Sequence, residues 1–239
     1  MTKLVALTFD VEHDCPPFAH TRKGMQYGLS GVMDMLEEKG VKGTFLFTGR
    51  MAEEFPKLAR RAGKKHELGC HGLEHERFDG LDALEVKRRL NEAKGMLERF
   101  GDVISFRAPN FQFPDRYYPI LLELGFKVDS TKARHKGWSK GVTWISGVLE
   151  VPATTTSIVT RLPWRLQMRF HRKFESPVVY IFHPWEFIEM PKRLRPDCWF
   201  GTGRGALEKL GKLIDYHLDS GAKFVTLREL LSLKIDPKP

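Results

Sequence analysis

Two histidines four residues apart, His71 and His75, have a spacing that suits a metal ion. A helix would place both side chains on one side, and a turn could also bring them together. Surface or helix-capping histidines show the same spacing, so the pair needs support from another ligand. Two histidines and one carboxylate form the usual open zinc site of hydrolases, which keeps a position for water and substrate. The pair therefore predicts a metal centre if a carboxylate lies nearby in the fold.

The acidic run over residues 10–14 can supply that carboxylate. In an extended chain, residues two apart point the same way, so Asp10 and Glu12 share one face, with Asp14 behind them if the strand continues. Metal-assisted hydrolysis needs one carboxylate to bind the ion and another to take a proton from water. Arg107 is a fixed cation that could hold the second carboxylate ionised and oriented. These residue types indicate hydrolysis at a metal centre.

Short apolar segments alternate with helical segments along the chain, which predicts an α/β fold with a parallel sheet, open or closed into a barrel. The stretch 135–175 does not follow this alternation. We expect strands over 4–9, 43–48, 67–70, 103–106, 126–128, 149–151, 178–182 and 223–226. We expect helices over 29–39, 55–62, 81–100, 116–124 and 206–218, and a last helix from residue 227.

The candidate side chains stand where four different expected strands end. Asp10 and Glu12 follow the first strand, His71 the third, Arg107 the fourth, and His183 the strand over 178–182. In parallel α/β folds, the carboxyl ends of the strands are where functional sites are built, because the loops there converge. We therefore predict that these residues form a single site.

Four short motifs, in this order along the chain, resemble those of the polysaccharide deacetylase family, the NodB-like or carbohydrate esterase family 4 group. The resemblance runs from about residue 4 to residue 230. It implies a distorted (β/α) barrel, usually with seven strands, formed here by a single domain over 1–235 with a tail over 236–239. The motifs are Thr8-Phe9-Asp10, His71-x-x-x-His75, Arg107-Ala108-Pro109 and Phe182-His183.

The resemblance also implies a role for each residue. Asp10 would be the catalytic base, with Arg107 as its partner, and His71 and His75 would be metal ligands. His183 would be the acid that protonates the leaving amine. The main-chain N–H of Asn110 would help to hold the oxyanion.

Two features depart from the common family pattern. Val11 stands where a second aspartate is usual, as in the Asp-Val-Asp or Asp-Val-Glu branch, so we expect Glu12 to be the third ligand and keep Asp14 as the alternative. The Asp-Trp motif that usually orients the acid histidine is not found. Asp129 lies in a stretch similar to one of the divergent branch, and the orienting partner of His183 stays open. Trp185 could form a wall for a sugar ring or could be ordinary packing.

The expected activity is metal-dependent hydrolysis of an amide that is not a peptide, with N-deacetylation of an N-acetylated sugar or sugar conjugate as the leading reaction. Zinc is the expected ion, with Co²⁺, Ni²⁺ or Mn²⁺ as alternatives. A deformylase or a ureide or cyclic-amide hydrolase would suit the same site. Outside the hydrolases, the alternative hypotheses for the function are a non-haem iron enzyme and a carbohydrate-binding pseudoenzyme.

The formal net charge of +9 favours acidic partners, such as phosphorylated or lipid-linked sugars and anionic membranes. No nucleic-acid recognition motif accompanies the charge, so specific nucleic-acid binding is not expected. The basic, aromatic segment 161–174 could contact an anionic membrane or could pack on the barrel.

Three cysteines without a CxxC pair argue against a disulfide framework and favour a reducing compartment. The first apolar run is too short for the core of a signal peptide. We therefore expect a cytoplasmic protein. Asparagine and glutamine are scarce while Lys, Arg and Glu abound, a composition typical of thermophiles.

Overall fold

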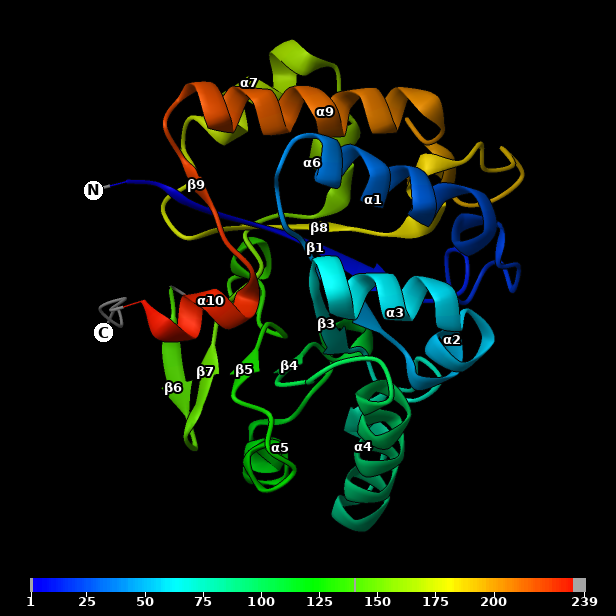
Figure 1. Cartoon of the computed structure of the whole chain (residues 1–239), viewed down its shortest axis with the longest axis vertical. Coiled ribbons are helices and arrows are strands. Elements are labelled where there is room, and N and C mark those ends of the chain that lie inside the picture. The colour runs from blue at the N-terminus through cyan, green and yellow to red at the C-terminus, as the bar shows by residue number, and fades with distance from the viewer. Residues whose placement is uncertain (1, 140, 234–239) are drawn as a thin grey trace.

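The computed structural model, which describes residues 2–139 and 141–233, has a curled, mostly parallel sheet that forms a half-barrel, as expected for the distorted barrel (Figure 1). The sheet consists of β1 (Leu4–Val11), β2 (Thr44–Phe47), β3 (Glu67–Cys70), β4 (Ser105–Phe106), β5 (Val128–Asp129), β6 (Thr143–Ile145), β7 (Val148–Glu150), β8 (Val178–Phe182) and β9 (Lys223–Phe224). The α-helices are α1 (Leu29–Glu38), α2 (Gly49–Glu54), α3 (Pro56–Lys65), α4 (Ala83–Glu98), α5 (Tyr118–Glu123), α6 (Ser157–Arg161), α7 (Trp164–His171), α8 (Pro196–Trp199), α9 (Arg204–Asp219) and α10 (Leu227–Ser232).

The strands follow the order β6-β7-β5-β4-β3-β2-β1-β8, and β9 pairs with the first residues of β1. Every pairing among the described strands is parallel except that of β6 with β7, which form an antiparallel hairpin at one end of the sheet. The sheet thus has nine described strands where the family resemblance implied about seven. The division at residue 235 stays a prediction, and residues 234–239 lie outside the described part.

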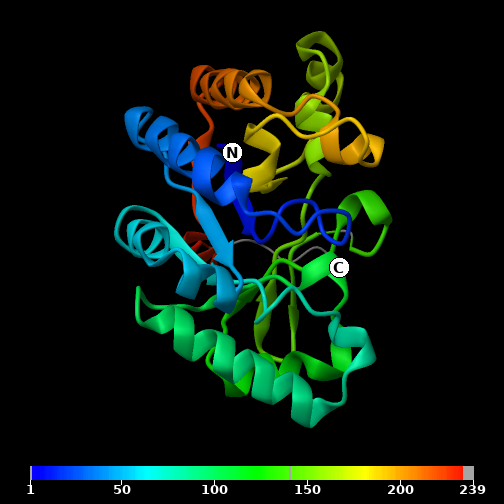
Figure 2. The same cartoon turned by 90° about the vertical axis from the view of Figure 1, so that its right-hand side faces the viewer.

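Apolar side chains from neighbouring strands form the core of the half-barrel. Phe9 of β1 stacks on Phe45 of β2, with ring centroids 4.6 Å apart, and on Phe182 of β8 at 5.4 Å. Helices such as α1, α3, α4 and α9 surround the sheet in both views (Figures 1 and 2). The loop after β1 lies across the end of the molecule that faces the viewer in Figure 2. The packed sheet therefore fixes the positions of the strand termini and of the side chains that follow them.

The stretch 135–175, which fitted no pattern, holds the β6–β7 hairpin and the helices α6 and α7. Gln167 and His171, one turn apart on α7, are fully buried, whereas Leu166 and Phe170 are exposed. One face of this basic, aromatic segment thus packs on the barrel, and contact with a membrane stays a prediction. None of the helices in the described part is long and apolar enough to cross a bilayer.

A disulfide joins Cys15 to Cys198, with Cα atoms 5.9 Å apart, so the expectation that the cysteines are unpaired is wrong for these two. The residues are 183 positions apart in sequence. They meet because β1 and β8 are neighbours in the sheet, so the loops that follow them also meet. Sequence spacing carries no signal for such a pair. Cys70 is the free cysteine and lies buried in the core.

Candidate active site

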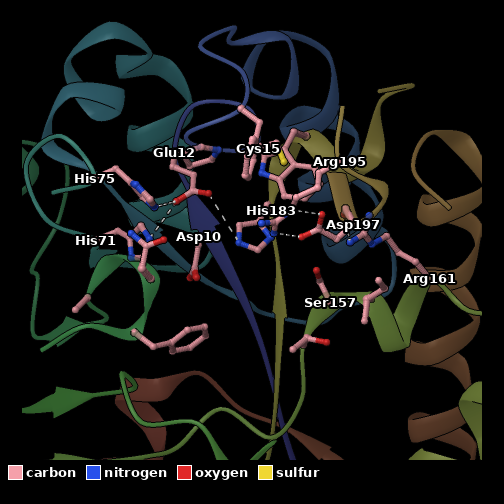
Figure 3. Close-up of a pocket in the computed structure, with 18 of the residues that line it drawn as sticks. Asp10, Glu12, Cys15, His71, His75, Ser157, Arg161, His183, Arg195 and Asp197 are labelled. Carbon is pink, nitrogen blue, oxygen red and sulfur yellow. Dashed lines mark hydrogen bonds and ion pairs between the residues drawn. The ribbon is translucent and has the colours of Figure 1, made fainter. Parts of the chain in front are cut away.

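Glu12, His71 and His75 come together at the carboxyl ends of β1 and β3, with their candidate ligand atoms all within 4.8 Å of one another. The Glu12 carboxylate oxygen Oε2 lies 2.7 Å from Nε2 of His75 and 3.3 Å from Nε2 of His71. Figure 3 shows the three side chains converging from two loops. The structure therefore brings the three predicted ligands into one cluster.

Each histidine is fixed by its surroundings. Nδ1 of His71 lies 2.8 Å from the carbonyl oxygen of Arg107, so Nδ1 carries a proton and Nε2 is the ring atom that faces Glu12. Residues 71–75 form a turn and not a helix, and His75 adopts a left-handed backbone with φ of 71°. The carboxylate of Glu76 accepts hydrogen bonds from the N–H groups of Leu73 and Glu74 and so holds this turn. A left-handed residue other than glycine costs free energy, and such residues gather at functional sites.

Glu12 and His75 shift each other's pKa. Burial raises the pKa of Glu12, but the neighbouring His75 and His71 outweigh it and hold that pKa well below its usual range. Burial lowers the pKa of His75, but the charge of Glu12 outweighs it, so the pKa is raised overall. Glu12 is therefore an ionised carboxylate in a buried position, as a metal ligand must be.

Asp14, the alternative ligand, is occupied elsewhere. Its carboxylate accepts hydrogen bonds from the hydroxyl of Thr21 at 2.5 Å and from the N–H groups of Lys23 and Gly24 at 2.8 and 2.9 Å. These bonds hold the loop between β1 and α1. Of the two carboxylates considered, Glu12 is the one beside both histidines.

Asp10 lies on the same face of β1 as Glu12 and pairs with Arg107. Nη1 of Arg107 donates to Oδ1 of Asp10 at 2.6 Å and to the hydroxyl of Thr8 at 2.8 Å. Arg107 has no exposed surface. Its remaining donors reach Ser130, with Nε bonded to the carbonyl oxygen and Nη2 to the hydroxyl. A buried guanidinium in which every nitrogen is hydrogen-bonded holds Asp10 in one orientation.

The stretch Asp129-Ser130-Thr131 supports the loop that carries Arg107. Thr131 accepts a hydrogen bond from the N–H of Ala108 at 2.9 Å and donates to Asp129 at 2.6 Å. Asp129 also accepts a hydrogen bond from the hydroxyl of Tyr118. Asp129 therefore serves the Arg107 loop and does not orient His183.

Glu186 is the residue that the sequence reasoning missed. Its Oε1 lies 2.7 Å from Nδ1 of His183 and also accepts the main-chain N–H of His183, three residues earlier. The pair forms a capping box at the start of the short 3₁₀ helix η6 (Pro184–Phe187). Histidine is not one of the usual capping residues, so the capping-box pattern does not reveal this pair in the sequence, and only the spacing of three residues points to it. Nε2 of His183 is left facing Glu12, 3.9 Å from its Oε1.

This environment keeps His183 charged. Burial lowers its pKa, but the hydrogen bond to Glu186 and the charge of Glu12 outweigh burial and raise the pKa to about 9. Trp185 stacks on the imidazole, with ring centroids 5.0 Å apart, and is 6% exposed. The guanidinium of Arg161 also lies near Trp185, 5.5 Å from the centre of its ring. Trp185 thus packs against the acid candidate and also lines the cavity.

One cavity of about 590 Å³ is lined by the candidate ligands and by Asp10, His183 and Trp185. Figure 3 shows the candidate ligands and Asp10 on one side, His183 in the middle, and Arg161, Arg195 and Asp197 on the other. Asn110 also lines the cavity and has a left-handed backbone, with φ of 55°. A cavity of this size can hold one or two sugar rings.

The donor set fits a divalent cation. Two imidazole nitrogens and one ionised carboxylate match the donor set of open sites in zinc hydrolases, and they face a cavity that leaves room for water and substrate. The hydrogen bond from His71 to the Arg107 carbonyl is the kind of outer support that fixes a ligand histidine. His13 and His20 stack on each other beside this cluster and are not part of it.

Comparison with known proteins gives concordant matches. The sequence model described as polysaccharide deacetylase matches residues 1–128. A peptidoglycan-N-acetylglucosamine deacetylase of Bacillus cereus is 31% identical over 120 residues, which are 50% of this chain and 38% of that relative. The match thus spans well under half the length of the curated relative.

Solved structures share the fold at lower identity. A candidate polysaccharide deacetylase from Mycobacterium smegmatis superposes with a TM-score of 0.75 and 20% identity, covering 100% of this chain and 96% of the other. A pseudoenzyme of carbohydrate esterase family 4 from Bacillus anthracis gives a TM-score of 0.67 and 21% identity, covering 96% and 66%.

Proposed function

This chain belongs to the polysaccharide deacetylase family, the NodB-like group of carbohydrate esterase family 4, and on that premise we propose that it is a metal-dependent N-deacetylase of an acetylated amino sugar. The observation that carries the proposal is the meeting of three groups in one cavity. These are the Glu12–His71–His75 cluster, the Asp10–Arg107 pair and the His183–Glu186 pair.

The ion would be held by Glu12, His71 and His75. Zinc suits two imidazoles and a carboxylate best, and Co²⁺, Ni²⁺ and Mn²⁺ also accept this donor set. When bound, the ion would acidify a water molecule and polarise the acyl oxygen.

Asp10 then takes the proton from the attacking water. Its hydrogen bond with the buried Arg107 holds it in an orientation that faces the cavity. The water oxygen bonds to the acyl carbon, and the main-chain N–H of Asn110 helps to hold the oxyanion that forms there. The left-handed backbone of Asn110 follows directly after Pro109 in the motif shared with the family.

His183 completes the reaction as the general acid. Its Nδ1–H donates to Glu186, so Nε2 is the atom that faces the cavity and delivers a proton to the sugar nitrogen. The C–N bond breaks, and acetate and a free amine leave. Trp185, beside His183, would form one wall for the sugar ring.

The substrate proposal follows the relative named for N-acetylglucosamine in peptidoglycan, so we take an N-acetylglucosamine-type glycan or conjugate as the first substrate. A deformylase or a ureide or cyclic-amide hydrolase would use the same groups and is separated by the product released. A pseudoenzyme should lack one of the side-chain types that the mechanism needs. All of them are present here, which favours an enzyme.

The disulfide bears on where the protein works. Disulfides persist in oxidising compartments and, inside cells, in proteins of hyperthermophiles. Because the composition is typical of thermophiles, we retain the cytoplasm as the proposed location. Recovery of the chain in the exported fraction of the cells that make it would contradict this.

The activity is tested by acetate release from N-acetylglucosamine and its oligomers, with the Asp10→Asn variant beside the parent. We expect the variant to bind zinc as the parent does and to lose about 10²–10⁴-fold in kcat, because the proton acceptor is gone. A variant that binds zinc and keeps full activity would remove Asp10 from the mechanism. Release of formate or ammonia in place of acetate would favour the alternative hydrolases.

A further inference from the structure

A second cavity, also of about 590 Å³, lies next to the catalytic one. Thr156 lines both cavities. The short helix η5 (Arg134–Lys136) also contributes to both, since Lys136 lines the catalytic cavity while Arg134 and His135 line the second. A substrate whose acetylated sugar fills the catalytic cavity therefore has an adjacent space for its remaining part.

The second cavity stands on the same edge of the sheet as the catalytic residues. The segments 130–136 and 151–156 follow β5 and β7, and they lie side by side through a parallel bridge between Ala133 and Ala153. The N–H of Arg134 donates to the carbonyl oxygen of Ala153 at 2.8 Å. The N–H of Thr154 donates to the carbonyl oxygen of Val179 at 2.9 Å, which ties this edge to β8. These two segments, which line the second cavity, are therefore held by the same sheet that carries His183.

One wall comes from the end of α7. Phe174 packs edge-on against His171 and Tyr180, with ring centroids 5.8 and 6.1 Å apart. Both of those rings are fully buried. Lys173, the residue before Phe174, is exposed and lines the cavity. The backbone that follows this lysine is therefore anchored to the core through Phe174, while the exposed lysine can meet a ligand.

The charge of the cavity is positive. Arg134 and Lys173 line it together with three consecutive threonines, and Glu175 is the carboxylate among the described lining residues. The guanidinium of Arg134 is poorly satisfied. Its Nε is buried without a hydrogen-bond partner, and its Nη1 reaches the carbonyl oxygen of Glu175 only at 3.4 Å. Burial lowers the pKa of Arg134 and the charge of Glu175 raises it, with burial the larger effect.

We infer that this second cavity binds a phosphate group of the substrate, so that the sugar deacetylated by the proposed activity is a phosphorylated one. Guanidinium, ammonium and hydroxyl groups are the donors that proteins gather around phosphate oxygens. The phosphate would be a sugar phosphate or a phosphodiester that joins the sugar to a larger group. The inference rests on the proposed deacetylation for its meaning, but its binding step can be measured alone.

The test is a calorimetric titration of the whole, metal-stripped protein, because a bound metal could itself attract phosphate. The ligands are N-acetylglucosamine, its 1-phosphate, and N-acetylmuramic acid, which carries a carboxylate. The variants are Lys173→Met and Arg134→Gln, with Lys57→Met on the exposed surface of α3 as the charge-matched control. Lys173 is exposed, so its replacement tests the site even if Arg134→Gln fails to fold.

We expect the sugar phosphate to bind about tenfold or more tightly than the neutral sugar, as one charge-assisted contact allows. Each cavity variant should remove most of this advantage, and the control should retain it. Equal binding of the neutral sugar and the phosphate, or no measurable binding of the phosphate, would overturn the inference. So would equal binding by the parent and the cavity variants. A carboxylate sugar that binds as tightly as the phosphate would overturn the phosphate assignment.

The two proposals fail in different ways. If zinc-loaded protein releases no acetate from any of these sugars while the phosphate still binds at Arg134 and Lys173, the deacetylation proposal fails and the binding site stands. If acetate is released equally fast from the neutral and phosphorylated sugars, by the parent and both cavity variants, only the phosphate inference fails.

Discussion

The proton of His183 is held in place by a carboxylate three residues further along the chain. The bond from Nδ1 of His183 to Glu186 selects the tautomer, and the short helix η6 fixes the distance between them. Arg161 lies 3.6 Å from the second oxygen of Glu186. An acid group placed in this way needs no partner from another strand, which explains why the usual Asp-Trp motif is dispensable here.

Replacing Glu186 with glutamine should move the pH profile. Although burial lowers the pKa of His183, its hydrogen bond to Glu186 raises it, so the acid stays protonated at neutral pH and kcat falls as the pH rises through that pKa. The amide keeps the shape of the side chain but removes the charge, so the pKa of His183 falls. We expect the alkaline limb of the kcat–pH curve to move down by about one pH unit, the equivalent of 1.36 kcal/mol.

The control for this measurement is Glu208→Gln, at an exposed position on α9. It removes the same charge at a distance from the cavity and should leave the curve unchanged. If the Glu186→Gln enzyme kept its alkaline limb where the parent has it, Glu186 would not govern the charge of His183.

At the scale of elements, the loop that carries His183 rests on the short π-helix η1 (Gly24–Gly28). No side chain fits between them. A Cβ atom on Gly28 would lie 2.3 Å from the carbonyl oxygen of Pro184, and one on Gly24 would lie 2.4 Å from the backbone nitrogen of Trp185. The two glycines therefore allow the backbones of η1 and η6 to touch, and this contact sets the position of the acid loop.

The variant Gly28→Ala should therefore lower both stability and activity. Overpacking a buried backbone contact costs about 1–3 kcal/mol of unfolding free energy, and Pro184, the residue displaced, follows His183 directly. The matched control is Gly31→Ala in α1, where the new Cβ would lie 3.8 Å from Leu207 in ordinary contact. Because alanine suits a helix better than glycine, the control should gain up to about 1 kcal/mol.

Urea unfolding and kcat are the measurements for both glycine variants. A Gly28→Ala protein as stable and as active as Gly31→Ala would mean that η1 does not support the acid loop.

Most elements were predictable from the sequence because the central strands are buried apolar runs and helices such as α1, α4, α5 and α9 end near a glycine. The strands over 67–70 and 178–182 have the bounds predicted for them. The β6–β7 hairpin was missed, although Ser146 and Gly147, with φ of 47° and 83°, form a two-residue turn of the kind that joins antiparallel strands. The side chains at strand ends were predictable because topology places those ends together.

Other features depend on contacts that no spacing encodes. In the core, the hydroxyl of Tyr180 lies 3.0 Å from Nδ1 of His171 and 3.0 Å from Nε2 of His217, so it joins side chains from three separate elements. The role of Asp129 as a support for the Arg107 loop, and not for His183, also required the fold. The sequence motifs identified the candidate site residues, but the side chains that contact them could be assigned only from the packing of the fold.

At the scale of the whole molecule, the disulfide ties the two loops that flank the catalytic cavity. Cys15 follows the proposed ligand Glu12 by three residues and lines the cavity, and Cys198 belongs to α8. The two cysteines pack with Trp185 and Met190 in a small hydrophobic cluster, separate from the main core. The bond therefore links the loop after β1 to α8 at the site.

Removing this link should destabilise the protein. Closing a loop of this length restricts the unfolded chain, so we expect a Cys15→Ser/Cys198→Ser variant to lose about 2–5 kcal/mol of unfolding free energy. Urea unfolding with and without dithiothreitol measures the effect. The reductant should weaken the parent and leave the double variant unchanged. A parent that is equally stable when reduced would show that the bond contributes nothing to stability.

The most direct test of the account is acetate release from N-acetylglucosamine oligomers by metal-stripped protein as zinc is added back. We predict that the stripped protein is inactive, that activity rises to a plateau at about one zinc per chain, and that a Glu12→Gln variant stays inactive at that zinc level. Full activity in the stripped protein, or in Glu12→Gln, would contradict a metal-dependent reaction at Glu12, His71 and His75.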